Sequence, residues 1–211
     1  MRPAAVEAMV LDGWNPVGLF GHLFLHASPL HLIGNMLFLW VFGNAVCAKV
    51  GNGPYLLIYF GMGVVSAVMH LAVSDEGAVG ASGAINGIVG MYLVMYPLND
   101  VKTLVGTFYY VRLLNVPAVF VILFFVMFDI VGILLGTERV AYWSHLAGIA
   151  AGVGLAGFLL VSGWIRMTEH GNYMGEVVYA RRPSVIDDTT RATMRPKEPG
   201  GGNPRNVRAP R

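Results

Sequence analysis

The sequence predicts an all-α protein that crosses a lipid bilayer several times as a helical bundle. Apolar residues make up 55% of the 211 residues, and Asp, Glu, Lys and Arg make up only 12%. That charged share is about half of the roughly 25% usual in soluble domains. The apolar residues are also concentrated in five long stretches. A small soluble fold with five such stretches would have no polar surface left.

Each of the five stretches is long enough to be a transmembrane helix. A bilayer core of about 30 Å takes roughly 20 helical residues, and none of the stretches contains Lys or Arg. Gly, Asn, Asp and Pro occur in the connections between them, as is typical of turns. The predicted spans are residues 30–48, 54–73, 78–96, 116–135 and 142–161.

Basic residues predict the orientation of the chain. Lys49, Lys102 and Arg112 fall in loops on one side, and nine further Lys and Arg follow from Arg166 onward. An excess of Lys and Arg marks the cytoplasmic side. We therefore expect a multi-pass protein of the bacterial cell membrane in three parts. These are an outward-facing or interfacial segment (1–29), a transmembrane domain (30–165) and a basic, mostly disordered cytoplasmic tail (166–211).

Two polar residues at the outward starts of predicted spans suggest chemistry. Ser82 stands at the head of the third span, where free backbone N–H groups and the helix dipole favour a developing negative charge. His145 stands at the head of the fifth span, at the same depth. A histidine within hydrogen-bond reach can take the proton of a serine and later give it to a leaving amine. An N-cap serine, or an interhelical hydrogen bond without chemistry, remains the alternative.

Small residues indicate that these two spans touch. Gly83 and Gly87 are four residues apart on the third span, and Gly148 and Gly152 are four apart on the fifth. Such spacings let transmembrane helices approach backbone to backbone. We expect the four glycines to line the interface between the helices that bear Ser82 and His145.

The first span contributes two further polar side chains. His31 and Asn35 are four residues apart and share one helix face. Both can donate hydrogen bonds, as stabilisation of an oxyanion requires. The alternative is polar contact between helices. A metal site built from His22, His26 and His31 is disfavoured because carboxylates are scarce nearby, and we expect no metal and no organic cofactor.

Three short segments together resemble the signature motifs of the rhomboid family of intramembrane serine proteases. They are HASPLHLIGNM (26–36), GASG (80–83) and SHLAG (144–148). Their order, spacing and topology match from about residue 22 to 161. The resemblance implies that Ser82 is the nucleophile and His145 the general base. It implies that His31 and Asn35, with the Ser82 backbone N–H, bind the oxyanion. It also implies that no carboxylate orients the histidine.

The chain departs from the family pattern in three ways. The family core has six spans and this chain shows five, so we expect a truncated or misassigned product that lacks the first, upstream span. Asn86 stands where some members place a tyrosine against the histidine ring, so the ring must be held otherwise. Asp129 lies midway in the fourth span, which corresponds to a helix described in the family as a gate, and we expect it to face the protein interior; it either tunes that gate or, the alternative that we favour, bonds a neighbouring helix.

The predicted function is an intramembrane serine endopeptidase. It would cut transmembrane substrates near their outward end with a Ser82–His145 dyad, and its partners would be those substrates and the lipid bilayer, with no nucleic acid. The alternative is a catalytically silent rhomboid-like protein that binds membrane clients. A small-solute transporter is disfavoured because no internal repeat is visible.

Overall fold

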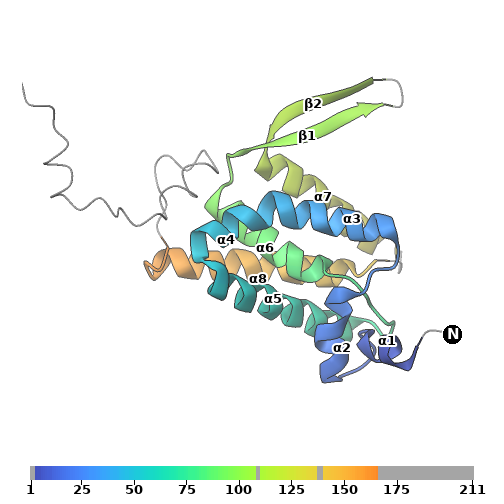
Figure 1. Cartoon of the computed structure of the whole chain (residues 1–211). Helices are drawn as coiled ribbons and strands as arrows, with labels where there is room; N and C mark the ends of the chain where they lie inside the picture. The colour runs from blue at the N-terminus through green and yellow to red at the C-terminus, as the bar shows by residue number, and fades with distance from the viewer. Residues whose placement is uncertain (1–2, 108–109, 137–139, 166–211) are drawn as a thin grey trace, which may run out of the picture. The chain divides into compact units, whose positions relative to one another are not determined.

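The computed structural model describes residues 3–107, 110–136 and 140–165. The predicted tail (166–211) lies outside the described residues. Figure 1 shows the arrangement of the elements. The helices are α1 (Ala4–Met9), α2 (Pro16–Gly21), α3 (Pro29–Phe38), α4 (Asn44–Val50), α5 (Asn52–Val73), α6 (Ser82–Met95), α7 (Ala118–Leu134) and α8 (Tyr142–Val161). A 3-10 turn (His22–Phe24), a π-helical turn (Leu39–Gly43) and strands β1 (Asp100–Thr107) and β2 (Tyr110–Pro117) complete the list.

The described part of the chain is mostly helical, which confirms the predicted fold class of a helical membrane bundle. Three helices are long and apolar enough to cross a bilayer, namely residues 29–50, 52–73 and 142–161. The first of them is α3, the π-helical turn and α4 in one run. Helices α6 and α7 are shorter apolar helices. All five predicted spans therefore correspond to apolar helices, although two are shorter than predicted.

The first span begins and ends at residues suited to those places. Ser28 caps α3 by accepting a hydrogen bond from the His31 N–H at 3.1 Å, and Pro29 occupies the first turn, where its missing N–H is harmless. The run ends at Gly51, whose φ of 98° is a conformation that glycine adopts readily. Helix α5 starts directly after it.

The third and fourth spans start later than the sequence predicted. Helix α6 begins at Ser82 because residue 78 is extended and pairs with Leu11 in an antiparallel bridge. With 14 residues, α6 is about 21 Å long. Helix α7 begins at Ala118 because Val116 and Pro117 belong to an unpredicted antiparallel hairpin, in which Asp100 lies opposite Pro117.

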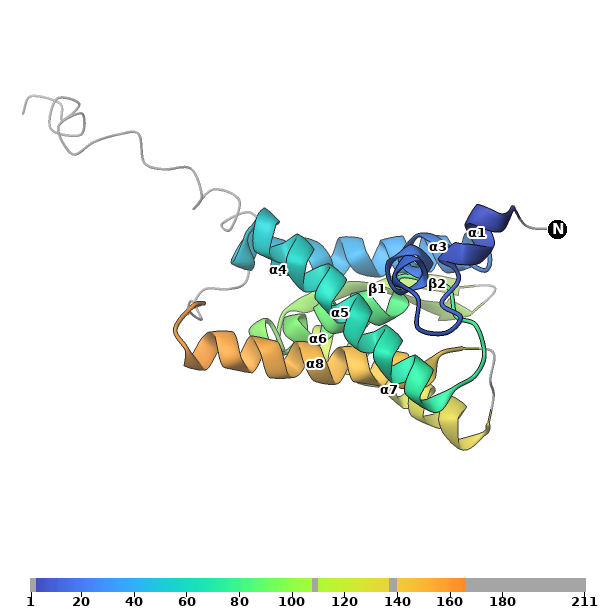
Figure 2. The same ribbon diagram turned by 90° about the horizontal axis from the view of Figure 1, so that it is seen from below.

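Helix α6 is the centre of the bundle. It contacts α5, α8 and the first span, and Figure 2 shows it among these helices. Its side chains Ile85, Ile88 and Tyr92 are buried in a core that includes Phe42 and Met62. Large apolar side chains on the outside of α7, such as Phe120 and Phe128, are exposed, as lipid-facing residues would be.

Glycines allow α6 and α8 to touch through their backbones. A β carbon at Gly148 would overlap the Gly83 carbonyl oxygen, and one at Gly152 would overlap that of Gly87. A β carbon at Gly83 would meet Ser66 of α5 and also Ser144 Oγ of α8, and one at Gly87 would meet Met62 of α5. All four glycines lie at the contact between α6 and α8. The carbonyls of Gly83 and Gly87 contact α8, and both residues also pack against α5, so α6 is closely packed on two sides.

Candidate active site

Ser82 is placed by the sharp turn that precedes α6. Gly80 has a φ of 129°, which disfavours residues other than glycine, and its N–H donates to the His22 carbonyl at 2.8 Å. The chain then enters α6 with Ser82 as its first residue. The Ser82 N–H belongs to the first helical turn, where N–H groups have no acceptor within the helix.

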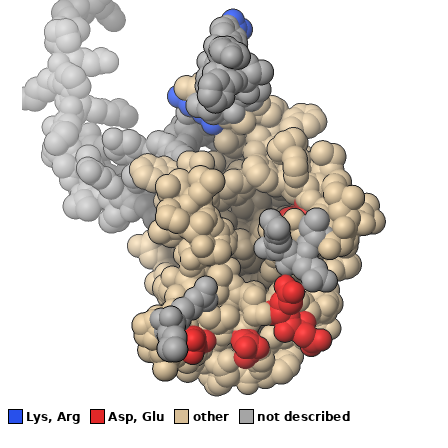
Figure 3. All heavy atoms as spheres, turned by 90° about the vertical axis from the view of Figure 1, so that its right-hand side faces the viewer, with Lys and Arg blue, Asp and Glu red and all other residues tan. Residues whose placement is uncertain are grey.

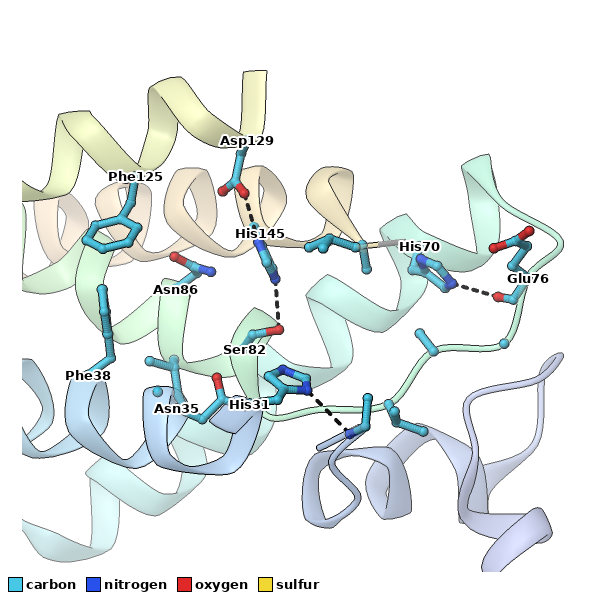
Figure 4. A pocket seen from close by; sticks show the side chains of 18 residues that line it. His31, Asn35, Phe38, His70, Glu76, Ser82, Asn86, Phe125, Asp129 and His145 are labelled. Atoms are coloured by element: carbon cyan, nitrogen blue, oxygen red, sulfur yellow. Dashed lines mark hydrogen bonds and ion pairs between the residues drawn. The ribbon is translucent and has the colours of Figure 1, made fainter. Parts of the chain in front are cut away.

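His145 meets Ser82 from the first turn of α8. Its Nε2 lies 2.8 Å from Ser82 Oγ, and the His145 side chain is 14% exposed. The two residues come from the heads of neighbouring helices and point toward one another (Figure 4). In this arrangement the hydroxyl donates and the imidazole accepts, which is the geometry of a serine beside a general base.

Asp129 of α7 lies on the other side of the same imidazole ring. Its Oδ1 is 3.1 Å from His145 Nδ1, and Figure 4 shows the carboxylate, the ring and the serine in line. The structure thus places a carboxylate against the histidine, although the resemblance implied that none orients it. Asp129 does bond a neighbouring helix, as predicted, but the residue that it bonds is His145 itself. Its place in the middle of an apolar span was the available signal, because polar groups are expensive there.

His31 and Asn35 lie beside the turn that leads to Ser82. The Ala27 N–H approaches His31 Nδ1 at 3.4 Å, so that nitrogen acts as the acceptor and Nε2 carries the proton. The Asn35 Nδ2 atom is buried and has no hydrogen-bond partner among the described residues. Both side chains abut Gly80. The first span thus presents two donors close to the serine.

All four predicted site residues line one cavity of about 630 Å³, together with Asp129. Asn86 lines it as well, so an amide stands at the position where the resemblance led us to look for an aromatic ring. Phe38 and Phe125 close the side between α3 and α7, with ring centroids 4.8 Å apart in an edge-to-face contact. Figure 3 shows that the corresponding end of the molecule is hollowed and that Asp and Glu side chains gather along one edge of it.

The remaining polar candidates brace the site. His70 of α5 donates from Nε2 to the Glu76 carbonyl at 2.8 Å and so tethers the segment that leads to Ser82. His22 is buried and donates from Nδ1 to the Gly18 carbonyl at 2.8 Å. Burial lowers the pKa of His22, and the nearby His70 lowers it further, whereas the hydrogen bonds that His22 makes to the backbone at Gly18 and Leu19 raise it. His26 packs edge-on against His31, and burial lowers the pKa of His26.

Metal ligation finds no support in this part of the chain. Among the residues that the structure describes, no group of three or more His, Cys, Asp or Glu side chains could hold a metal ion. Of the three histidines considered as ligands, His22 bonds to the Gly18 carbonyl, and His26 packs against His31.

The fold and the site define a polytopic helical membrane protein with a serine–histidine pair in a cavity at one end of its bundle. Residues 13–162 match the family model of the Rhomboid domain. The chain therefore belongs to the rhomboid family.

Several rhomboid proteases are similar to this chain. The putative rhomboid protease YdcA of Bacillus subtilis (strain 168) is 28% identical over 141 residues, which cover 66% of this chain and 64% of that protein. Rhomboid protease GlpG of Klebsiella pneumoniae (strain 342) is 27% identical over 137 residues, 65% of this chain and 46% of that protein. Rhomboid protease GluP of Bacillus subtilis (strain 168) is 41% identical over 69 residues, 33% of this chain and 14% of that protein. The chain thus spans less than two thirds of the length of each of these relatives.

Proposed function

We propose that this protein is an intramembrane serine endopeptidase that cleaves transmembrane substrates near their outward end. The observation that carries the proposal is the 2.8 Å contact between Ser82 Oγ and His145 Nε2, inside a cavity that the Asn35 side chain also lines. Membership of a family whose relatives are named proteases supports it.

The proposed reaction begins with proton transfer from Ser82 to His145. As the Oγ–H proton moves to Nε2, Oγ bonds to the carbonyl carbon of the scissile peptide, and the π electrons of that carbonyl move onto its oxygen. The tetrahedral intermediate then collapses. The C–N bond breaks, the amine leaves with the proton from His145, and an acyl ester remains on Ser82. Water hydrolyses the ester with His145 again moving the proton, which regenerates the serine.

Donors beside Ser82 would stabilise the negative charge on the carbonyl oxygen. The His31 Nε2–H, the Asn35 amide and the Ser82 backbone N–H are suited to this task, because fixed donors in a low-dielectric site need little rearrangement as charge develops. An unpartnered buried amide such as that of Asn35 is costly in a folded protein. A substrate oxygen would supply the missing partner.

The substrates we propose are membrane segments that unwind easily. A transmembrane helix in lipid has all its backbone groups hydrogen-bonded, so its peptide bonds reach a serine only when the helix opens locally. Small or helix-breaking residues near the cut would lower the free energy of that opening. The loop charges at Lys49, Lys102 and Arg112 support placing the cut at the outward end of such segments.

The test combines a fluorophosphonate probe with cleavage of a model transmembrane substrate in detergent. We expect the wild-type chain to do both, and Ser82→Ala and His145→Ala to abolish both while melting normally. Ser162→Ala is the matched control, because Ser162 is an exposed serine near the end of α8, and it should behave as wild type. Cleavage by purified Ser82→Ala protein would contradict the proposal. A folded wild-type chain that neither labels nor cleaves would favour a catalytically silent membrane-binding protein.

A further inference from the structure

Helices α7 and α8 meet in a register that places Asp129 against His145. A β carbon at Gly132 would overlap the ring of Tyr142, so α7 comes close to the start of α8 at this point. Asp129 lies three residues before Gly132, and His145 lies three residues after Tyr142. One helical turn further along this antiparallel pair, Asp129 Oδ1 meets His145 Nδ1 at 3.1 Å. The Asp129–His145 contact thus follows from helix packing, because α7 and α8 touch at two successive turns, first at Gly132 and Tyr142 and then at Asp129 and His145.

Burial among apolar helices gives the Asp129 carboxylate an unfavourable free energy unless a partner compensates for its lost hydration. The side chains of Asp129 and His145 are 13% and 14% exposed, respectively. A carboxylate among apolar helices loses its hydration, and an ionised one is retained in a membrane only with a partner. The described partner is the Nδ1–H of His145. The opposite nitrogen of that ring faces the nucleophile, so the carboxylate bears directly on the state of the base.

We propose that Asp129 is a positioning residue that converts the serine–histidine pair of this protein into a Ser82–His145–Asp129 triad. The proposal rests on the proposed function. By accepting the Nδ1–H bond, Asp129 fixes the imidazole tautomer whose Nε2 lone pair faces Ser82. When the serine proton arrives at Nε2, the carboxylate balances the positive charge of the imidazolium. The resemblance to the family implied that no carboxylate has this role. Asp129 would also hold the imidazole ring in place, which Asn86 cannot do by aromatic stacking.

The decisive variant is Asp129→Asn, which keeps the size of the side chain and removes its charge. An amide can turn its NH₂ toward Nδ1, and this would favour the imidazole tautomer that carries its proton on Nε2. A protonated Nε2 cannot accept the proton of Ser82. In soluble triad hydrolases the same change lowers kcat by about 10⁴, and we expect a loss on the order of 10² or more here. KM should stay unchanged, because the carboxylate acts on the base. Asp129→Glu should recover part of the lost kcat, which a purely structural role would not predict.

The matched control is Asp100→Asn, the same chemical change at an exposed carboxylate at the start of β1. It should keep wild-type kcat. A wild-type kcat for a folded Asp129→Asn protein would overturn the inference, and so would a loss that appears only as a lower melting temperature with unchanged kcat.

A second measurement does not depend on activity. The ¹⁵N NMR signals of His145, assigned by comparison with His145→Ala, report which ring nitrogen carries the proton. We expect the Nδ1–H tautomer in the wild-type chain and a shift toward Nε2–H in Asp129→Asn. A wild-type Nε2–H tautomer would overturn the inference, even if Asp129→Asn did not fold. An inactive wild-type chain with the Nδ1–H tautomer would refute the proposed protease and leave the Asp129–His145 relationship standing.

Discussion

The α carbon of Gly80 lies against the imidazole ring of His31, so closely that a β carbon at residue 80 would come within 2.7 Å of His31 Cε1. The turn that leads to Ser82 and the helix that bears the candidate oxyanion donors are therefore fitted to one another at a single glycine. Two constraints coincide there, because Gly80 also has a φ of 129°.

Replacing Gly80 by Ala should disturb both the backbone and the His31 ring. Backbone strain of this kind costs roughly 1–3 kcal/mol, and displacement of the ring should lower kcat in addition. Melting in detergent and substrate cleavage measure the two effects. Gly13→Ala is the control, since Gly13 has a φ of 72° but no atom within 4 Å of the added carbon. If the two variants lost stability equally and Gly80→Ala kept full turnover, the contact with His31 would be unimportant.

The contact between α6 and α8 predicts a contrast between two glycines of one helix. Gly148→Leu should force the helices apart, because even a β carbon there overlaps the Gly83 carbonyl oxygen, and both the melting temperature and kcat should fall. Gly154→Leu should be tolerated, because the space at the exposed Gly154 is open. Equal behaviour of the two variants would show that the helices do not meet where the structure places them.

Asn35 should show opposite effects on activity and stability. Asn35→Leu removes a buried amide nitrogen that has no described partner, so the melting temperature should stay level or rise. Loss of one oxyanion donor typically lowers kcat by about 10²–10³, and we expect that here for Asn35→Leu and His31→Ala. Fluorophosphonate labelling at Ser82 should slow without disappearing. Full turnover by both variants would reduce these residues to polar contacts between helices.

His22 should make the protein sensitive to acid. Burial lowers the pKa of His22 in the folded state, so between that pKa and the unfolded value near 6.5 the unfolded chain binds more protons. The stabilisation from neutral His22 is present above pH 6.5 or so and is lost as the pH falls below that value. The variant His22→Gln can still donate to the Gly18 carbonyl. When the pH is lowered from about 7.5 to about 5, its melting temperature should fall less than that of wild type. Identical losses would contradict this prediction.

The sequence located the candidate residues because their signals are local. His31 and Asn35 share a face through helical spacing alone, and Ser82 and His145 stand at the heads of apolar stretches that end at recognisable turns. Five stretches without Lys or Arg were enough to define the bundle. These features depend on neighbours within a few residues along the chain.

Other features depend on how separate elements meet, and the sequence could not supply them. The bond from Asp129 to His145 requires the register of α7 against α8, which Gly132 and Tyr142 set in three dimensions. The late start of α6 depends on the bridge between Leu11 and Ala78. The outward-facing, interfacial and cytoplasmic assignments of residues 1–29 and 166–211, and the expectation of an upstream span, stay predictions.

Because Ser82 depends on α8 for its histidine partner, the pair can form only at a late point in the synthesis of the domain. Ser82 and His145 are 63 residues apart, and a ribosome adds roughly 5–20 residues per second. A nascent chain therefore carries the serine for several seconds before the histidine has been translated. Throughout that interval α6 lacks α8, the helix that the Gly83 and Gly87 carbonyls contact. The hydrogen bond that would activate the nucleophile thus forms only after α8 has been synthesised. While the earlier helices are inserted into the membrane, Ser82 has no histidine base beside it.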